Sequence, residues 1–326
     1  MKSIIFIIPY FGNFSNYFNL WLESCKANPT INWLILTDNE KKYGYPSNVK
    51  VKHISFKELC AKFQSHFEFK LALKKPYKLC DFRPAFGDVF YDYIKKYDFW
   101  GYCDTDLIWG NMRKFLTDNL LDKYEKIGSR GHCCIIRNTE KMRKAYLYDS
   151  STMVTYRDVF SSPKAFCFDE QKGFGKYCIE NDIMTYDNFC FFDVSIMHDD
   201  YRVPYYEKDQ FEYMAHNIFE YRNGSLFLLW VKYGSSKLNR KEIMYVHFQK
   251  RLMTVNIKNI ASNNFFIYGD SFNTCMHDLK AEDVKRLDPK SIKRTLYIKV
   301  LWKKIKAEFL HLGGIKYYKY PHCCPV

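Results

Sequence analysis

The sequence lacks any apolar run long enough to cross a membrane. A spanning helix needs about 20 apolar residues, and no stretch of the 326-residue chain approaches that length. The run Ile4–Ile8 is stopped by Pro9, and no small-residue cleavage site follows it, which argues against a secretory signal peptide. We therefore expect a soluble protein whose first apolar run is a buried β-strand.

A cysteine or histidine pattern typical of a metal centre is also missing. The 12 cysteines include no Cys-x-x-Cys pair, so a zinc ribbon or a thioredoxin-type motif has no support. Scattered cysteines of this kind predict reduced thiols in a core, and hence a cytoplasmic protein. The nine histidines do not cluster, which disfavours the alternative of a two-metal phosphohydrolase.

Acidic residues are in deficit, with 36 Asp and Glu against 50 Lys and Arg and a formal charge of +14. Such an excess favours polyanionic partners, namely nucleic acid, anionic lipid or phosphorylated substrates. The basic residues are spread out and no RNA-binding signature is present, so we expect no nucleic-acid partner. A basic nucleic-acid or polyanion-binding protein stays as the alternative.

Apolar runs and helical spacing alternate from the first residues onward. Strands are predicted at Ile4–Ile8, Asn32–Leu36 and Val49–Ile54, and a helix at Asn16–Cys25. This order predicts an α/β fold, Rossmann-like, with a mostly parallel sheet flanked by helices. Ligands of such sheets bind beyond the carboxyl ends of the strands. The residues that follow the first two strands, and that we expect to contact a ligand, are Pro9, Tyr10, Gly12 and Asp38.

An aromatic, strand-like run from Tyr97 ends in Asp104-Thr105-Asp106. Carboxylates at the end of a buried strand are costly to keep charged unless a positive group lies against them. A divalent metal on a diphosphate is the simplest such partner, because Mg²⁺ and Mn²⁺ prefer oxygen ligands. We expect Asp104 and Asp106 to bind Mn²⁺ or Mg²⁺ and Thr105 to lie at the phosphate-bearing ligand. The alternative is a solvated loop.

A second block, Lys78 to Arg83, brings charge of both signs. Lys78 and Arg83 are positive, and Asp81 can accept hydrogen bonds from sugar or ribose hydroxyls. The alternative is a helix start that Asp81 caps, with Arg83 in a surface ion pair.

A third block follows a predicted strand at Glu242–His247. His247 can supply an imidazole to the same metal, and Lys250 and Arg251 can neutralise a diphosphate leaving group. The alternative is a structural histidine.

A fourth block holds the acids Asp169 and Glu170 in a region that we expect to be rich in loops up to about residue 200. A carboxylate there could act as a base on an acceptor hydroxyl or stabilise a positive reaction centre. The alternative is the acidic first turn of a helix. Asp193 and Asp199-Asp200 are further acidic candidates.

The spacing of Leu79–Arg83, a helix, and Tyr97–Asp106 resembles one stretch of a glycosyltransferase group. That group includes the yeast outer-chain mannosyltransferases and the glucosyltransferase domains of large clostridial toxins, and its pattern is Asp-x-x-Arg followed by Gly-Gly-x-Tyr-x-Asp-x-Asp. This chain has Asp-x-Arg, and Phe99-Trp100-Gly101 in place of Gly-Gly. Its segments Ile8–Gly12, Pro76–Pro84 and His247–Arg251 also resemble bacterial proteins found with capsule and surface-polysaccharide genes.

The resemblance implies a GT-A fold and a metal-dependent hexosyltransferase. Retention is favoured over inversion, and both stay open. Its donor would be a nucleotide-sugar, with UDP as the nucleotide, and its acceptor a glycan or lipid-linked glycan of a bacterial surface polysaccharide. By the same resemblance Asp104 and Asp106 bind metal, Asp81 and Arg83 touch the donor, and His247 is the late metal ligand.

The expected domain organisation is one GT-A domain over residues 1–260 with an appendage at 261–326. Within the domain, 1–115 would bind the nucleotide-sugar, and 116–260 would form the acceptor side and the metal-closing strand. In the appendage Ile298, Leu301, Trp302 and Ile305 share one face of a basic helical pattern. Such a helix can lie on an anionic membrane, here the inner membrane face, or pack on the domain.

Overall fold

A computed structural model describes residues 1–148, 154–170, 173–188, 190–195, 201, 214–257, 264–274 and 279–288. The chain forms two compact units, Met1–Cys190 and Phe191–Val326. The predicted amphipathic helix lies outside the described residues, and the expected divisions at 115 and 260 stay predictions. None of the described helices is long and apolar enough to span a bilayer, and no disulfide joins any of the described cysteines.

The first unit is built on a seven-stranded sheet with the order β3-β2-β1-β4-β7-β6-β8. Its strands are β1 (Ile4–Pro9), β2 (Ile31–Thr37), β3 (Val49–His53), β4 (Phe99–Cys103), β6 (Lys126–Arg130), β7 (Cys133–Arg137) and β8 (Thr185–Tyr186). β3, β2, β1 and β4 run parallel, β7 is antiparallel to both of its neighbours, and β6 and β8 are parallel. The predicted α/β fold with a mostly parallel sheet is confirmed.

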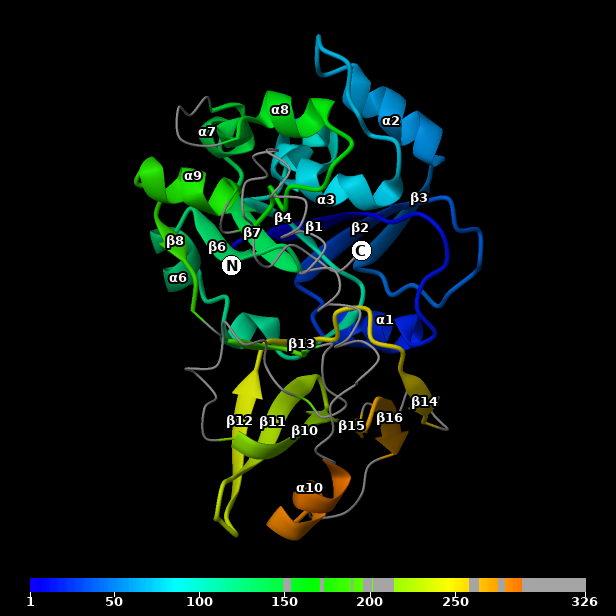
Figure 1. Cartoon of the computed structure of the whole chain (residues 1–326), viewed down its shortest axis with the longest axis vertical. Coiled ribbons are helices and arrows are strands. Elements are labelled where there is room, and N and C mark those ends of the chain that lie inside the picture. Colours follow the sequence, from blue (N-terminus) through cyan, green and yellow to red (C-terminus); the bar gives the residue numbers. More distant parts are fainter. Residues whose placement is uncertain are drawn as a thin grey trace, which may run out of the picture. The chain divides into compact units, whose positions relative to one another are not determined.

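Helices cover both faces of this sheet (Figure 1). On one face lies α1 (Phe18–Lys26), and on the other lie α2 (Phe56–Gln64), α3 (Leu79–Phe82), α4 (Phe86–Val89) and α5 (Tyr91–Ile94). Alternate residues of β1 serve the two faces: Ile5 and Ile7 belong to the core under α2 and α3, whereas the Phe6 ring stacks on Trp33 with centroids 6.0 Å apart. Burial on both faces explains why the strands are continuous apolar runs in the sequence.

Several helices of the first unit are shorter than their sequence pattern or were not expected. The region expected to be rich in loops up to about residue 200 contains α8 (Tyr156–Ser161) and α9 (Phe174–Glu180). Before it, α6 spans only Asp118–Lys123 and α7 only Glu140–Arg143. A capping box between Thr155 and Asp158 begins α8. Helices of this length depend on caps and tertiary packing rather than on a long periodic stripe, so a search for periodicity does not find them.

The second unit contains a six-stranded sheet with the order β12-β11-β10-β15-β16-β14. Its described elements are β9 (Phe191–Asp193), β10 (Met214–Arg222), β11 (Ser225–Lys232), β12 (Leu238–Ile243), β13 (Tyr245–His247), β14 (Thr254–Asn256), β15 (Asn264–Tyr268), β16 (Ser271–Thr274) and α10 (Ala281–Leu287). A hairpin turn at Asn223-Gly224, with φ of 49° and 82°, joins β10 to β11. The strand predicted at Glu242–His247 is divided between β12 and β13, and β13 pairs in parallel with β9.

Gly101 is required by the close approach of β4 to its neighbours. A Cβ at this position would lie 2.3 Å from the Cys134 carbonyl oxygen and 3.2 Å from the Phe6 ring. Because that carbonyl belongs to the paired strand β7, it cannot move without disturbing the ladder. We expect Gly101→Ala to lower the free energy of unfolding by about 1–3 kcal/mol, measured by urea denaturation.

The matched control for this prediction is Gly12→Ala. Its added Cβ would meet nothing within 4 Å, and only the left-handed φ of +95° would be strained, at about 1–2 kcal/mol. If the Gly101 variant is no less stable than the wild type, the close packing of β4 on β7 is wrong.

Candidate functional site

The site lies where the strand order of the first unit reverses. From β1 the chain proceeds to β2 and β3 on one side, then returns to pair β4 on the other side of β1. In open α/β sheets the ligand crevice forms at this reversal, outside the carboxyl ends of the strands. Tyr10 follows β1 and Asp104 follows β4, so both predicted segments meet at this position.

The turn that carries the two carboxylates is fixed on both sides. The Asp104 amide donates to the His132 carbonyl at 3.0 Å. After Asp106 the buried strand β5 (Leu107–Trp109) begins, and the Asn28 amide group donates to the Gly110 carbonyl at 2.9 Å. Thr105 is buried, whereas Asp104 and Asp106 are partly exposed. The carboxylates therefore lie on a turn that hydrogen bonds hold at the carboxyl edge of the sheet.

The carboxyl ends of β1 and β2 supply the neighbouring wall. Burial, and then the carboxylates of Asp106 and Asp104, raise the pKa of Tyr10, which places its phenol in the field of both acids. The Gly12 amide donates to Asp38 Oδ1 at 2.8 Å, which ties the two strand ends together. Pro9, the last residue of β1, is half-buried. Pro9, Tyr10, Gly12 and Asp38 thus lie at one edge, as their positions after the strands predicted.

Arg83 connects three segments at this edge. Its guanidinium donates through Nη2 to Asp104, through Nη1 to Asp169 Oδ2 at 2.9 Å, and to the Gly131 carbonyl at 2.6 Å. The side chain is 13% exposed. Burial acts to lower the pKa of Arg83, but Asp104 and Asp169 outweigh it, so the pKa is raised well above its usual value. The alternative of a surface ion pair is therefore wrong.

Asp169 is almost fully buried, at 3% exposure. Burial, and after it the negative charges of Glu170 and Asp81, raise the pKa of Asp169 to about 8 against the opposing effect of Arg83. The Tyr102 hydroxyl donates to the Asp169 carbonyl at 3.0 Å. The alternative of a helix first turn is wrong, since α9 begins only at Phe174 and has no acidic residue in its first turn.

The raised pKa of Asp169 has a consequence for stability. The folded state holds this proton more tightly than the unfolded chain, so the contribution of Asp169 to stability is complete below pH of about 4 and is lost as pH rises towards 8. Asp169→Asn keeps the shape and removes the titration. We expect the stability of this variant relative to the wild type to rise between pH 5 and pH 8, measured by urea denaturation at several pH values. Parallel pH profiles would contradict it.

Lys78 and Asp81 form an ion pair of 2.8 Å, with 5% and 2% of their side chains exposed. Burial lowers the pKa of Lys78, and Asp81 works against that effect. Helix α3 has no side-chain capping bond at its start, so the capping alternative for Asp81 is wrong. The Asp81 carboxylate instead accepts the backbone N–H groups of Phe166 and Phe168.

In the second unit, His247 is held by an acid on the adjacent strand. His247 Nδ1 lies 2.8 Å from Asp193 Oδ1, and Gln249 Nε2 donates to Asp193 Oδ2 at 2.7 Å. Both His247 and Asp193 are buried. Metal-binding imidazoles are commonly oriented by such a carboxylate on the other ring nitrogen. The Asp193 carboxylate therefore orients the His247 ring through Nδ1, and the role of His247 as a metal ligand stays a prediction. Asp199-Asp200 lie outside the described residues.

The two basic residues after His247 differ from each other. Lys250 is exposed, at a turn where Gln249 and Lys250 have φ of 49° and 60°. Arg251 is 5% exposed, and its guanidinium bonds Asp270 at 2.5 Å and the Ser195 carbonyl at 2.8 Å. Arg251 is therefore a buried residue that is hydrogen-bonded within the second unit.

Sequence reasoning missed three residues of the first-unit site. Tyr102 and His132 contact the acids as described above, and Gly131 leaves the space that Asp169 fills. A Cβ on Gly131 would lie 2.7 Å from Asp169 Oδ2 and 3.3 Å from Arg83 Nη1. The sequence signal available for these residues was Gly131, which lies between two strands, and a glycine there indicates only a turn.

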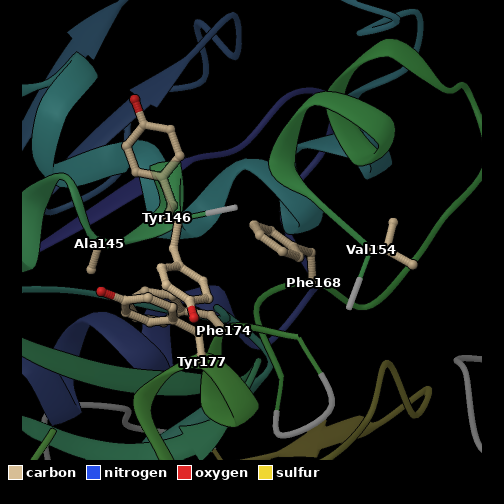
Figure 2. A pocket seen from close by; sticks show the side chains of 7 residues that line it. Ala145, Tyr146, Val154, Phe168, Phe174 and Tyr177 are labelled. Carbon is tan, nitrogen blue, oxygen red and sulfur yellow. The ribbon is translucent and has the colours of Figure 1, made fainter. Parts of the chain in front are cut away.

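A small cavity of the first unit lies at a different place. It is lined by Ala145, Tyr146, Tyr148, Val154, Phe168, Phe174 and Tyr177 (Figure 2). Only about 10 Å³ is open to the centre of a water-sized molecule, roughly what one water needs. It cannot hold a sugar or a nucleotide. It lies close to the site because one of its lining residues, Phe168, directly precedes Asp169 in the chain.

The donor atoms of the site fit a hard divalent cation. Asp104 and Asp106 offer carboxylate oxygens, the ligands that Mg²⁺ and Mn²⁺ prefer. Burial raises the pKa of the nearby thiols Cys103 and Cys133 well above the usual value, so they stay protonated and are poor metal ligands. The third predicted ligand, His247, belongs to the second unit, and its part in this site stays a prediction.

The fold and the site thus define an α/β unit with acidic residues at the switch point of its sheet. The chain belongs to a family of unknown function (DUF6625), whose model matches residues 6–276. No curated protein matches the sequence significantly.

Similar solved structures are glycosyltransferases. An active-site mutant of LgtC has 12% identity and a TM-score of 0.33 over 59% of this chain and 74% of its own. Mouse xyloside xylosyltransferase 1 has 10% identity and a TM-score of 0.35 over 60% of this chain and 88% of its own. Galactosyltransferase LgtC with donor and acceptor sugar analogs has 12% identity and a TM-score of 0.26 over 59% and 75%.

Proposed function

We propose that this protein is a metal-dependent glycosyltransferase of the GT-A fold that uses a nucleotide-sugar, with UDP as the nucleotide. One observation carries the proposal. Asp104 and Asp106 lie at the switch point of a parallel sheet, and Arg83 joins Asp104 to the buried acid Asp169. A bound diphosphate requires positive charge, and a bound sugar requires hydrogen-bonding groups. Departure of the nucleotide from the sugar requires both kinds of group next to each other.

The donor would lie along the edge formed by the ends of β1, β2 and β4. Tyr10 and Asp38 would frame the base and ribose, with Pro9, Gly12 and Thr105 shaping the backbone that the nucleotide approaches. Arg83 is close enough to Asp104 to share the same ligand, and Lys250 and Arg251 are proposed at the diphosphate from their sequence position. Lys78 and Asp81 complete the predicted donor set, and their role is taken up below.

The proposed cofactor is Mn²⁺ or Mg²⁺, held by Asp104 and Asp106, with His247 as the third ligand. Such an ion would offset the charge that develops on the diphosphate as the nucleotide leaves. The Asp193 carboxylate supports this role for His247, because it fixes the ring through Nδ1.

Asp169 and Glu170 are the proposed catalytic acids. A carboxyl with a pKa of about 8 exchanges its proton near neutral pH, which is the range that general acid–base catalysis requires. Asp169 could receive the acceptor hydroxyl proton or stabilise the sugar cation while Glu170 positions the acceptor. We propose retention of the anomeric configuration, and NMR of the product made from a defined donor anomer distinguishes retention from inversion.

The proposed acceptor is a glycan or lipid-linked glycan of a bacterial surface polysaccharide, handled at the inner face of the membrane. This part rests on the resemblance of the first-strand, Pro76–Pro84 and His247–Arg251 segments, and on the basic pattern after residue 291. Attraction to anionic lipid would keep the enzyme near such an acceptor.

The proposal is tested by release of nucleotide from a panel of UDP-, GDP- and CMP-sugars, with Mn²⁺, with Mg²⁺ and with EDTA. We expect one UDP-sugar to be turned over slowly by water in the absence of an acceptor, and EDTA to stop the reaction. Turnover of none of the donors under any metal condition would contradict the proposal and favour the polyanion-binding alternative.

A further inference from the structure

We propose that Asp81 and Lys78 form a positioning pair that docks the segment Lys164–Asp169 on α3 and thereby holds Asp169 beside Arg83. The resemblance places Asp81 at the donor, but its surroundings in the first unit suit another role. Asp81 is 2% exposed, and both of its oxygens accept hydrogen bonds from this chain. The importance of this docking for catalysis rests on the proposed function of Asp169. The contacts that make up the docking all lie within the first unit.

The Asp81 carboxylate lies in a concave site made by backbone amides. The Phe168 amide donates to Oδ1 at 2.9 Å, and the Phe166 amide lies 3.2 Å from Oδ1 and 3.1 Å from Oδ2. Cys167, between them, has a φ of +53°. Two amides around one left-handed residue form the anion-binding arrangement known as a nest. The carboxylate therefore stabilises a loop shape that a non-glycine residue adopts only at a cost.

Lys78 holds the same segment from its beginning. Its ammonium lies 2.8 Å from Asp81 Oδ2, donates to the Lys164 carbonyl at 2.5 Å, and lies 4.9 Å from the centre of the Phe166 ring. Asp81 thus accepts hydrogen bonds from backbone amides of the loop, while Lys78 donates a hydrogen bond to one of its carbonyls. Because both side chains are almost fully buried, they are firmly placed, and neither is oriented towards solvent.

The far end of the segment is anchored by packing. The Phe168 ring is buried and is one of the side chains that line the cavity of Figure 2, and the Phe168 carbonyl accepts the Phe174 amide at 2.7 Å. The next residue is Asp169, whose Oδ2 receives Arg83 Nη1. Loss of the Asp81 contact would release the loop immediately before the acid, so the ion pair of Asp169 with Arg83 would lose its geometry.

The test compares Asp81→Asn with the matched control Asp98→Asn. Asp98 also accepts a distant backbone amide, that of Ser3 at 2.7 Å, but lies away from this segment. In Asp81→Asn an amide group faces backbone donors and the Lys78 ammonium. We expect hydrogen exchange at the Phe166 and Phe168 amides to become at least about tenfold faster, and the Arg83 Nε–H NMR signal to move towards that of an unpaired arginine. Lys78→Met should give the same two changes.

Three readouts decide between positioning and donor contact. Positioning predicts that Asp81→Asn keeps the affinity for the UDP-sugar with Mn²⁺ within about threefold while turnover falls at least about tenfold. Unchanged exchange of both amides, or a loss of UDP-sugar affinity with the amides still protected, would overturn the inference. If the wild type turns over no donor, the proposed function fails, while the exchange rates and the Arg83 signal still decide whether the pair docks the segment.

Discussion

Replacing Asp106 with asparagine is expected to lower turnover of the nucleotide-sugar by about 10²–10³-fold at saturating Mn²⁺. Asparagine keeps the size of the side chain but removes a negative oxygen from the turn between β4 and β5. Metal affinity should fall as well, because a neutral amide oxygen is a weaker ligand for a hard cation. The measurement is kcat at increasing Mn²⁺ together with calorimetric binding of the metal.

The control for this prediction is Asp92→Asn. Asp92 is a surface carboxylate, 80% exposed and paired only loosely with Lys95 at 3.8 Å. Its variant should match the wild type in both turnover and metal affinity. If Asp106→Asn also keeps wild-type turnover, then the acidic turn is a solvated loop and the proposed metal site is wrong.

Replacing Arg83 with methionine is expected to have the largest effect on stability. The guanidinium satisfies Asp104, the nearly buried Asp169 and the Gly131 carbonyl. Removing one partner of a buried ion pair leaves the other without compensation, which costs about 3–5 kcal/mol. The loss should be measured by urea denaturation above pH 8, because the Asp169 carboxyl is largely protonated at lower pH and then needs no positive partner.

A double-mutant cycle separates the ion pair from the packing of Arg83. Once Arg83 is absent, Asp169→Asn should restore stability, because it removes the buried charge. We expect the double variant Arg83→Met with Asp169→Asn to be more stable than Arg83→Met alone, with a coupling of about 1–3 kcal/mol. Strict additivity of the two substitutions would show that Asp169 and Arg83 do not interact.

Much of the fold follows from local sequence patterns. The runs that became β1, β2 and β3 are apolar at nearly every position, since the sheet is covered on both faces, and such runs are visible without a structure. The same logic put Tyr10, Asp38 and Asp104 at strand ends, and hence at one edge. The short helices α8 and α9 escaped prediction because α8 depends on a capping box and α9, which has no side-chain cap, depends on tertiary packing.

The pairings within the site were beyond reach of the sequence. Asp169 lies 86 residues from Arg83, and Asp193 lies 54 residues from His247. No local period encodes contacts at that separation, so each acid could be proposed only as one of several. The structure shows what the sequence could not, namely that both arginine side chains are interior. Arg83 pairs with Asp104, and Arg251 pairs with Asp270.

The most direct measurement of the central claim is thermal stabilisation of the purified protein by UDP, GDP and CMP, each with and without Mn²⁺, repeated on Asp106→Asn. The account predicts that UDP raises the melting temperature only when Mn²⁺ is present, and that the shift disappears in the variant. A shift that is independent of metal, or the same shift in Asp106→Asn, would contradict a metal–diphosphate site at the switch point of this sheet.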